Sequence, residues 1–531
     1  FMLNIIGVKV SLELIKWNKI FYDSLESRDL LVALQQVGAF FILAGFQAFI
    51  ALLSTVAGGM MSSNGFFVNL LQIRWRKVLT EFSLNRWFRN KAFWYLDTSE
   101  KTGLDNPDQR IAEDCNLFVR QFIMVTLDLS KKIIGLISYV VLLWNVADYA
   151  LTFTLFERTF MIERYMVWIA PVYVAVSMIF THALGKPLFK LTIQQQHKEA
   201  DFRYALTRFR DSKEQIALQN GEKVERNLLD ERFSNVVHNW KRLNVRELVQ
   251  GLFTKPYIYT IMRVPTFLAL PAYFIGGATL GGMMQMSSAF GNVTQSLSWF
   301  IFSYKELITL GASSARLDAF LEKIDSFESL RAKTKQGNGA LVIRDLKLST
   351  ESGKHLMNVP HAEIASGQTV LIQGRSGLGK STLFRTIAGL HHDFDGDVVV
   401  PEGRKMFLSQ KAYFPLGGMA HAVAYPNTLD EKDLPVIEEI ISAVGFTNFD
   451  EKLLYHDMAK LSGGEQQRLI IARILFNKPE WVFLDESTNA LDEESERFLM
   501  ELMQERLPNS SFVIISHSDA INNYAKNYSV M

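Results

Sequence analysis

The stretch Gly374-Arg375-Ser376-Gly377-Leu378-Gly379-Lys380-Ser381-Thr382 decides the fold of the C-terminal part of the chain. It has the pattern G-x-x-x-x-G-K-S, and it lies between an apolar strand predicted over 369–373 and an amphipathic helix predicted over 383–390. Its glycines let backbone N–H groups surround phosphate oxygens, while Lys380 reaches the β- and γ-phosphates and Ser381 offers a hydroxyl to Mg²⁺. The predicted phosphate-binding residues are Gly374, Ser376, Gly377, Gly379, Lys380, Ser381 and Thr382.

Two acidic residues follow a second apolar run. Trp481-Val482-Phe483-Leu484 predicts a buried parallel strand, and Asp485 and Glu486 come directly after it. Acids in this position lie at the carboxyl edge of the sheet, where α/β proteins bind their ligands. In P-loop enzymes an aspartate there holds Mg²⁺, and a neighbouring group orients or deprotonates the attacking water. We therefore expect Asp485 to bind Mg²⁺ and Glu486 to act as the general base.

A third candidate site opens the helix predicted over 469–476. It consists of Ser462, Gly463 and Gly464. Serine is a common N-cap, but a helix start also binds anions through its free backbone N–H groups. The place of these residues, shortly before the strand 481–484, favours an anion site over a simple helix cap.

The string Leu461-Ser462-Gly463-Gly464-Glu465 resembles the LSGGQ signature of the ATP-binding cassette superfamily, with Glu in place of the final Gln. The resemblance implies an α/β P-loop domain that hydrolyses ATP with Mg²⁺. It further implies that Gln410 contacts Mg²⁺ and the attacking water, and that His517, after the strand predicted over 512–515, contacts the γ-phosphate. Residues 489–492 are similar to the D-loop of the family, with Asn489 where Ser is usual.

One element of the family pattern is missing. Many relatives stack adenine on an aromatic side chain about thirty residues before the P-loop lysine, whereas 348–355 contains no Phe, Tyr or Trp. His355 is a possible substitute, so the sequence supports nucleotide phosphate chemistry more firmly than adenine selectivity.

The N-terminal part carries five long apolar windows, and none follows residue 310. A bilayer span needs about 20 such residues, because a rise of 1.5 Å per residue must cover about 30 Å of hydrocarbon. Buried helices of a large soluble core are the alternative, and the clustering of the windows argues against it. Residues 1–12 read as the end of a further span that is cut short. We expect an all-α membrane domain of six helices; the windows are 37–61, 133–146, 166–184, 251–275 and 289–310.

The overall composition fits two unlike halves. The 531 residues include 56 Lys and Arg against 55 Asp and Glu, and 48% are hydrophobic, with a mean hydropathy of +0.08. The balanced charge argues against a nucleic-acid partner or a disordered scaffold. The single Cys115 excludes an intrachain disulfide framework and a cysteine-cluster metal site.

Charge along the chain predicts the topology. Basic residues gather in 74–91 and again in 186–250, whereas 276–288 carries no charge. Basic loops stay in the cytoplasm, so we expect both basic segments and the C-terminal half there. The predicted domains are a transmembrane domain over 1–326, with long cytoplasmic helical extensions, and an ATP-binding domain over 336–531. Arg263 lies half-way along the window 251–275, beside Pro265 and Pro271, where it either lines a hydrophilic pathway or snorkels.

The order of the two domains resembles a cassette half-transporter of the exporter (type IV) fold. That resemblance implies a homodimer with two composite ATP sites and short cytoplasmic coupling helices, the second near 214–222. The string Asn106-Pro107-Asp108-Gln109-Arg110-Ile111 resembles the peroxisomal fatty-acid transporters and the bacterial SbmA/BacA-like group with a fused cassette. It implies a multi-pass protein of the bacterial inner membrane.

The transported solute and its direction stay open at this stage. We expect ATP-driven import of hydrophilic peptides or other polar compounds, as the resemblance to the bacterial group implies. Export of lipid, acyl or drug-like substrates is one alternative. An ATP-gated channel or transport regulator is the other, although Glu486 and His517 favour repeated turnover.

Overall fold

The computed structural model describes residues 1–54, 65–98, 107–155, 158–261, 263–275, 277–328, 333–350, 352–375, 377–446, 454, 461–516, 521 and 524–529. It divides into two compact units. The N-terminal unit comprises Phe1–Ala92 and Thr102–Ile324, and the C-terminal unit comprises Phe93–Lys101 and Asp325–Met531. The short segment from Phe93 lies inside the predicted membrane domain 1–326 in sequence, but it groups with the C-terminal unit.

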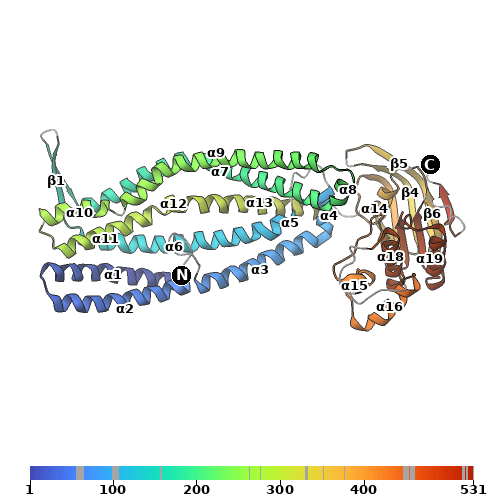
Figure 1. Cartoon of the computed structure of the whole chain (residues 1–531), viewed down its shortest axis with the longest axis horizontal. Coiled ribbons are helices and arrows are strands. Elements are labelled where there is room, and N and C mark those ends of the chain that lie inside the picture. The colour runs from blue at the N-terminus through green and yellow to red at the C-terminus, as the bar shows by residue number, and fades with distance from the viewer. Residues whose placement is uncertain are drawn as a thin grey trace. The chain divides into compact units, whose positions relative to one another are not determined.

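Long helices that lie side by side build the N-terminal unit (Figure 1). Helix α7 packs along α9, α1 along α2, and α11 against α6 and α1. A two-stranded antiparallel ribbon, β1 (Ala150–Leu155) with β2 (Arg158–Glu163), joins α6 to α7. The helices up to residue 328 are α1 (Met2–Glu26), α2 (Leu30–Ser54), α3 (Phe66–Phe88), α4 (Ala92–Thr98), α5 (Pro107–Gln109), α6 (Cys115–Val146), α7 (Tyr165–Asp211), α8 (Lys213–Leu218), α9 (Glu222–Ile261), α10 (Val264–Phe274), α11 (Leu280–Leu297), α12 (Trp299–Phe302) and α13 (Tyr304–Glu328). Of these, α4 from Phe93 onward belongs to the C-terminal unit.

Two helices of the described residues are long and apolar enough to cross a membrane, α2 and α7. The window 133–146 lies within the single helix α6, whereas two further windows are divided between helices. The window 251–275 is shared by α9 and α10, and the window 289–310 runs through α11, α12 and α13. Proline accounts for part of this, because Pro265 falls in the first turn of α10, where it suits a helix start but not a helix interior.

The first helix differs from the sequence expectation. Residues 1–12 were expected to end a span, but α1 continues to Glu26. The polar residues after Leu12 hid this helix because they interrupt the apolar pattern. Several of them contact neighbouring helices, since Asp23 and Glu26 accept hydrogen bonds from the backbone N–H groups of Gly281 and Leu280 at the start of α11.

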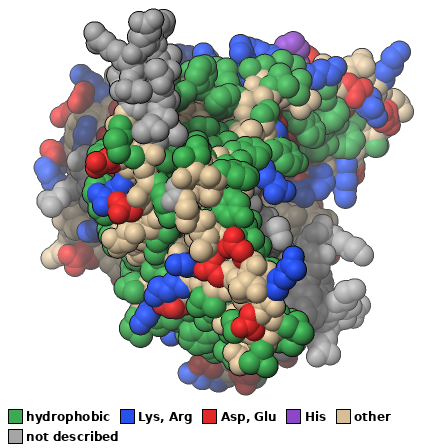
Figure 2. Space-filling view, turned by 90° about the vertical axis from the view of Figure 1, so that its left-hand side faces the viewer, with side chains coloured by type: hydrophobic (Ala, Val, Ile, Leu, Met, Phe, Trp, Pro, Cys, Tyr) green, Lys and Arg blue, Asp and Glu red, His purple; other side chains and the backbone are tan. Residues whose placement is uncertain are grey.

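Helices α1 and α11 approach each other closely at Gly281. A Cβ atom placed there would lie 2.1 Å from the carbonyl oxygen of Lys19, so only glycine allows this contact. Seen from the end where α1 runs into α2, hydrophobic side chains are interspersed with acidic and basic ones (Figure 2). The apolar core of this unit lies between the helices and includes Val8, Leu143, Ala170 and Phe290.

The C-terminal unit contains two sheets. A parallel sheet has the strand order β11-β6-β10-β9-β8, and a second sheet has the order β3-β7-β4-β5. The strands are β3 (Lys335–Gly337), β4 (Ala340–Ser349), β5 (His355–Ala365), β6 (Thr369–Gln373), β7 (Phe394–Pro401), β8 (Lys405–Leu408), β9 (Trp481–Asp485), β10 (Ser511–Ile515) and β11 (Lys526–Ser529). The helices are α14 (Lys380–Ile387), α15 (Gly418–Ala424), α16 (Leu434–Ala443), α18 (Gly463–Asn477) and α19 (Glu493–Arg506), with a 3₁₀ turn over Glu431–Asp433.

The predicted strands around the phosphate-binding stretch are confirmed. The alternating apolar residues Leu341, Ile343, Leu346 and Leu348 indicate, from the sequence alone, a strand at the edge of an antiparallel sheet. Strand β4 is antiparallel but lies inside its sheet, between β7 and β5. A register shift between Arg344 and Lys347 explains the broken alternation, because one extra residue turns the following side chains to the other face.

Candidate nucleotide-binding site

Parallel pairing of four strands brings the predicted site residues to one edge of the sheet. Strand β10 pairs with β6 on one side and β9 on the other, and β9 pairs with β8. Their carboxyl ends lead into Gly374, Ser516, Asp485 and Ser409. Segments that lie far apart in the sequence therefore meet where parallel sheets bind ligands.

The loop between β6 and α14 holds the lysine of the motif. Gly377 and Gly379 have φ angles of 81° and 103°, in the left-handed region that only glycine adopts without strain. Lys380 is buried, with its ammonium donating to the carbonyl oxygens of Gly374 at 2.5 Å and Arg375 at 3.4 Å. The charged end of Lys380 thus lies within the loop that would enclose phosphate groups.

Asp485 and Ser381 face each other beside this loop. Burial raises the pKa of the Asp485 carboxyl, while the hydrogen bond from the Ser381 hydroxyl opposes the shift and the neighbouring charge of Glu486 adds to it. A divalent cation would favour the charged form of this half-buried acid. A hydroxyl and a carboxylate are hard oxygen ligands of the kind that Mg²⁺ prefers, so the donor set fits this metal.

Glu486 is held in a specific conformation. Its φ angle is 50°, unusual for a residue with a side chain, and its backbone N–H donates to Ile515 at 2.9 Å. The side-chain amides of Gln410 and Asn489 each donate to Glu486 Oε2 at 3.1 Å. The structure therefore joins the predicted general base to the Q-loop glutamine and to the D-loop, and the strained backbone is of the kind found at functional sites.

The predicted anion site at the start of α18 is also a helix cap. Ser462 Oγ accepts from the backbone N–H of Glu465, whose carboxylate accepts from the N–H and the hydroxyl of Ser462 at 2.7 and 2.8 Å. These bonds lower the pKa of Glu465. Ala490 lies close to Gly463: a Cβ atom placed on Gly463 would be 3.3 Å from the Cβ atom of Ala490. Ser462 stays exposed in this chain.

Sequence reasoning missed a further set of contacts in the C-terminal unit. In α4, Trp94 Nε1 donates to the carbonyl of Leu390 at 3.1 Å, and Tyr95 donates to that of Gly389 at 3.1 Å. The Arg385 guanidinium lies over the Trp94 ring. A cavity of about 510 Å³ is lined by Trp94 together with Ser381, Gln410 and Asp485. The run of three adjacent aromatic residues, Phe93-Trp94-Tyr95, was the available signal.

Three predicted residues lie outside the described part of the chain: Ser376, His517 and Asn106. His355 begins β5 and is exposed. The next residue, Leu356, would lie 3.2 Å from a Cβ placed on Gly379, so the start of β5 runs beside the phosphate loop. The role of His355 toward adenine stays a prediction.

Two family models match the chain. The model described as ABC transporter transmembrane region 2 matches residues 1–274. The model described as ABC transporter matches residues 357–489. The chain belongs to the ABC transporters. It consists of a membrane domain followed by an ATP-binding domain with α/β sheets, and it couples ATP hydrolysis to the movement of solute across a membrane.

Several relatives align with this ABC transporter over most of their length. The Inner membrane ABC transporter ATP-binding protein YddA of Escherichia coli is 32% identical over 98% of this chain and 90% of its own. The mouse Lysosomal cobalamin transporter ABCD4 is 26% identical over 91% and 84%. Human ATP-binding cassette sub-family D member 3 is 24% identical over 81% and 70%. The chain is thus related to the D-type transporters as well as to a bacterial inner-membrane protein.

Glu486→Gln should abolish ATP turnover and preserve ATP binding. The amide keeps the size of the side chain but cannot take a proton, and general-base catalysis contributes about 10²–10⁴-fold. Phosphate release and nucleotide binding, measured on the purified full chain, test this expectation. Glu438→Gln, which changes an exposed carboxylate on α16 of the same unit, is the matched control. Normal hydrolysis by Glu486→Gln would remove Glu486 from this role.

Lys380→Ala should weaken ATP binding. A charge-assisted hydrogen bond contributes about 1.5–3 kcal/mol, so its loss corresponds to about 10- to 100-fold in affinity. Lys405→Ala, at the start of β8 and far from the motif in sequence, controls for the loss of a positive charge. Unchanged affinity of Lys380→Ala for a fluorescent ATP analogue would show that the phosphate site is misassigned.

Proposed function

We propose that the chain is a half-transporter that works as a homodimer and imports hydrophilic peptides or other polar compounds across a bacterial inner membrane. The arrangement of side chains around Glu486 is the observation that supports ATP-driven transport. A candidate general base bonded to Gln410 and Asn489, next to the Asp485–Ser381 pair, is suited to repeated hydrolysis and not merely to nucleotide binding.

In this proposal each ATP lies between two copies of the chain. The P-loop of one copy, with Lys380 and the N–H groups from Gly374 to Thr382, holds the phosphates. The exposed Ser462 of the other copy, with Gly463 and Gly464, closes the site. Mg²⁺ would be held by Ser381, Asp485 and Gln410, and it supplies charge stabilisation for phosphoryl transfer. Glu486 accepts the proton of the attacking water, and His517 contacts the γ-phosphate.

The membrane part of the proposal assigns six passes of the exporter (type IV) type. They are α1, α2 with α3, α6, α7, α9 with α10, and α11 to α13. The domain boundaries are 1–326 and 336–531, with the ATP-binding domain in the cytoplasm. The short helix α8 between α7 and α9 supports the second coupling segment expected near 214–222.

Three points support transport of a polar solute. Arg263 lies exposed at the break between α9 and α10, where a charge in an apolar stretch is costly unless it faces water or a partner. The mouse relative is named as a transporter of cobalamin, which is a polar compound. The resemblance of 106–111 to the SbmA/BacA-like group points the same way.

Cells that make the wild-type chain should accumulate a labelled hydrophilic peptide antibiotic, and cells that make Glu486→Gln should not. The variant binds ATP but cannot complete the cycle, so only turnover distinguishes the two strains. Uptake of label per cell, at matched protein levels, is the measurement. Lower accumulation in wild type than in the variant would indicate export, and equal accumulation would contradict transport of this class of solute.

Arg263→Ala should reduce uptake of this peptide while sparing basal ATP hydrolysis, because it alters the pathway and leaves the ATP site intact. Lys255→Ala is the matched control. Lys255 is also exposed on α9, but it lies near one end of the apolar stretch 251–275, where a long side chain reaches the interface. Equal uptake by Arg263→Ala and wild type would exclude Arg263 from the pathway.

A further inference from the structure

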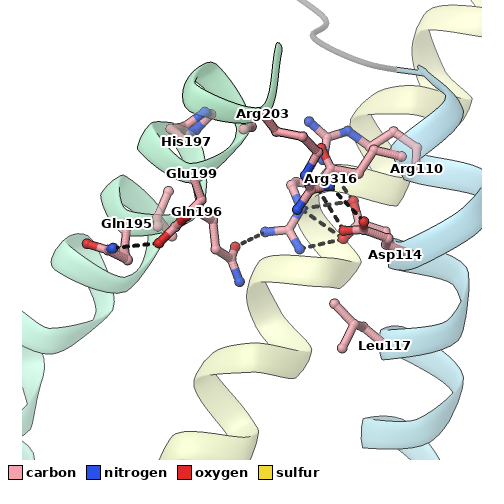
Figure 3. A pocket seen from close by; sticks show the side chains of 13 residues that line it. Arg110, Asp114, Leu117, Gln195, Gln196, His197, Glu199, Arg203 and Arg316 are labelled. Atoms are coloured by element: carbon pink, nitrogen blue, oxygen red, sulfur yellow. Dashed lines mark hydrogen bonds and ion pairs between the residues drawn. The ribbon is translucent and has the colours of Figure 1, made fainter. Parts of the chain in front are cut away.

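Three helices of the N-terminal unit surround a polar cavity of about 170 Å³ (Figure 3). It lies between the start of α6, the C-terminal half of α7, and α13. Charged side chains from all three helices line it. A single turn of π-helix, Arg110–Asp114, leads into α6 at this point, and such turns occur frequently at functional sites.

Asp114 is the centre of this cluster. It is 2% exposed, and its carboxylate accepts from two arginines. Arg110 Nη1 donates to Oδ2 at 2.8 Å, and Arg316 of α13 donates to both oxygens at 2.5–3.1 Å. Arg316 Nη1 also donates to Gln196 Oε1 of α7 at 3.0 Å. We call the bonded cluster of Arg110, Asp114, Gln196 and Arg316 the Asp114 latch.

Stability alone is a poor explanation for the latch. Removing charges from water is costly, and well-packed apolar side chains of similar size often stabilise a protein as much or more. Here the charged groups also border a cavity instead of a closely packed core. The ion pairs provide a fixed geometry, because a bidentate hydrogen bond from a guanidinium to a carboxylate sets the orientation of one helix relative to another.

The elements joined by the latch lie close in sequence to connections of the chain. The turn Arg110–Asp114 follows α4, whose Trp94 and Tyr95 hydrogen-bond to Leu390 and Gly389 just after α14. Helix α7 leads to α8, and α13 leads to β3. Two of the three elements therefore adjoin chain connections between the units, at 101/102 and 324/325, and the third adjoins the connection from α7 to α8.

We propose that Asp114 and Arg316 are positioning residues that make the starts of these connections move as one body, so that closure of the ATP-binding domains reaches the far end of the membrane helices. The inference rests on the proposed ATP-driven cycle. Without the latch, ATP binding would still close the ATP-binding domains, but the displacement would be absorbed between α6, α7 and α13.

Two spin-label positions in the homodimer distinguish closure of the ATP-binding domains from movement at the far end of the membrane helices. Phe498 on α19 is exposed in the C-terminal unit, and Ile275 at the end of α10 is exposed in the N-terminal unit. A cysteine at either position gives one distance between the two copies, measured by pulsed electron paramagnetic resonance. Cys115→Ser removes the buried native thiol, and Glu486→Gln holds ATP without turnover.

In wild type, ATP should change both distances. In Asp114→Asn and in Arg316→Gln, ATP should still change the Phe498 distance, but the Ile275 change should be lost. Arg316→Lys, which keeps the charge but not the bidentate hydrogen bond, should restore part of it. With Glu486 intact, the ATP hydrolysis rates of the two variants should stay within about twofold of wild type, because coupling energies act between sites and the ATP site is unchanged.

Arg203→Gln is the matched control. It removes an exposed ion pair, Arg203 with Glu113 at 3.0 Å, from the same cavity without touching Asp114, so both distance changes should survive. A full Ile275 response in Asp114→Asn and Arg316→Gln would overturn the latch. Loss of both responses in these variants would show a purely structural role and would also overturn it. Absence of both responses in wild type would instead refute the ATP-driven cycle itself.

Discussion

Parallel pairing of β6, β10, β9 and β8 is the constraint on which the site depends. In a parallel sheet all carboxyl ends face the same edge, so one sequence of pairings brings the phosphate loop, the acid pair Asp485 and Glu486, and Gln410 together. Strand β10 has a special place because it separates β6 from β9. The backbone N–H of Glu486 donates to Ile515 at the end of β10, which ties the candidate base to the strand that precedes His517.

Most of the C-terminal unit could be predicted because its signals are local. The strands 369–373 and 481–484 are short apolar runs, and the glycines of the phosphate loop are required where φ is positive, as at Gly377 and Gly379. The links between motifs are not local. Nothing in the sequence says that Asn489 and Gln410 share one oxygen of Glu486, because that depends on loop conformations set by tertiary contacts.

The N-terminal unit was harder to predict for a physical reason. An apolar window shows which part of a helix has an apolar environment, but it does not show where the helix ends. The apolar pattern therefore indicated only residues 1–12, although α1 continues to Glu26. Its polar side chains bond to neighbours, as Asp23 does to Gly281. The segment with Trp94 and Tyr95 was missed likewise, because donors that bind backbone carbonyls leave no periodic pattern.

The cap of α18 has a consequence for how two copies of the chain come together. Ser462 already holds the carboxylate of Glu465, and these hydrogen bonds lower the pKa of Glu465. In the proposed homodimer, a phosphate group that takes up the Ser462 hydroxyl would displace that carboxylate, so assembly around the nucleotide would exchange one anion for another. The net gain would be the difference between two charged hydrogen bonds, smaller than either bond alone, and Glu465 would act as an internal competitor that favours separation of the two copies.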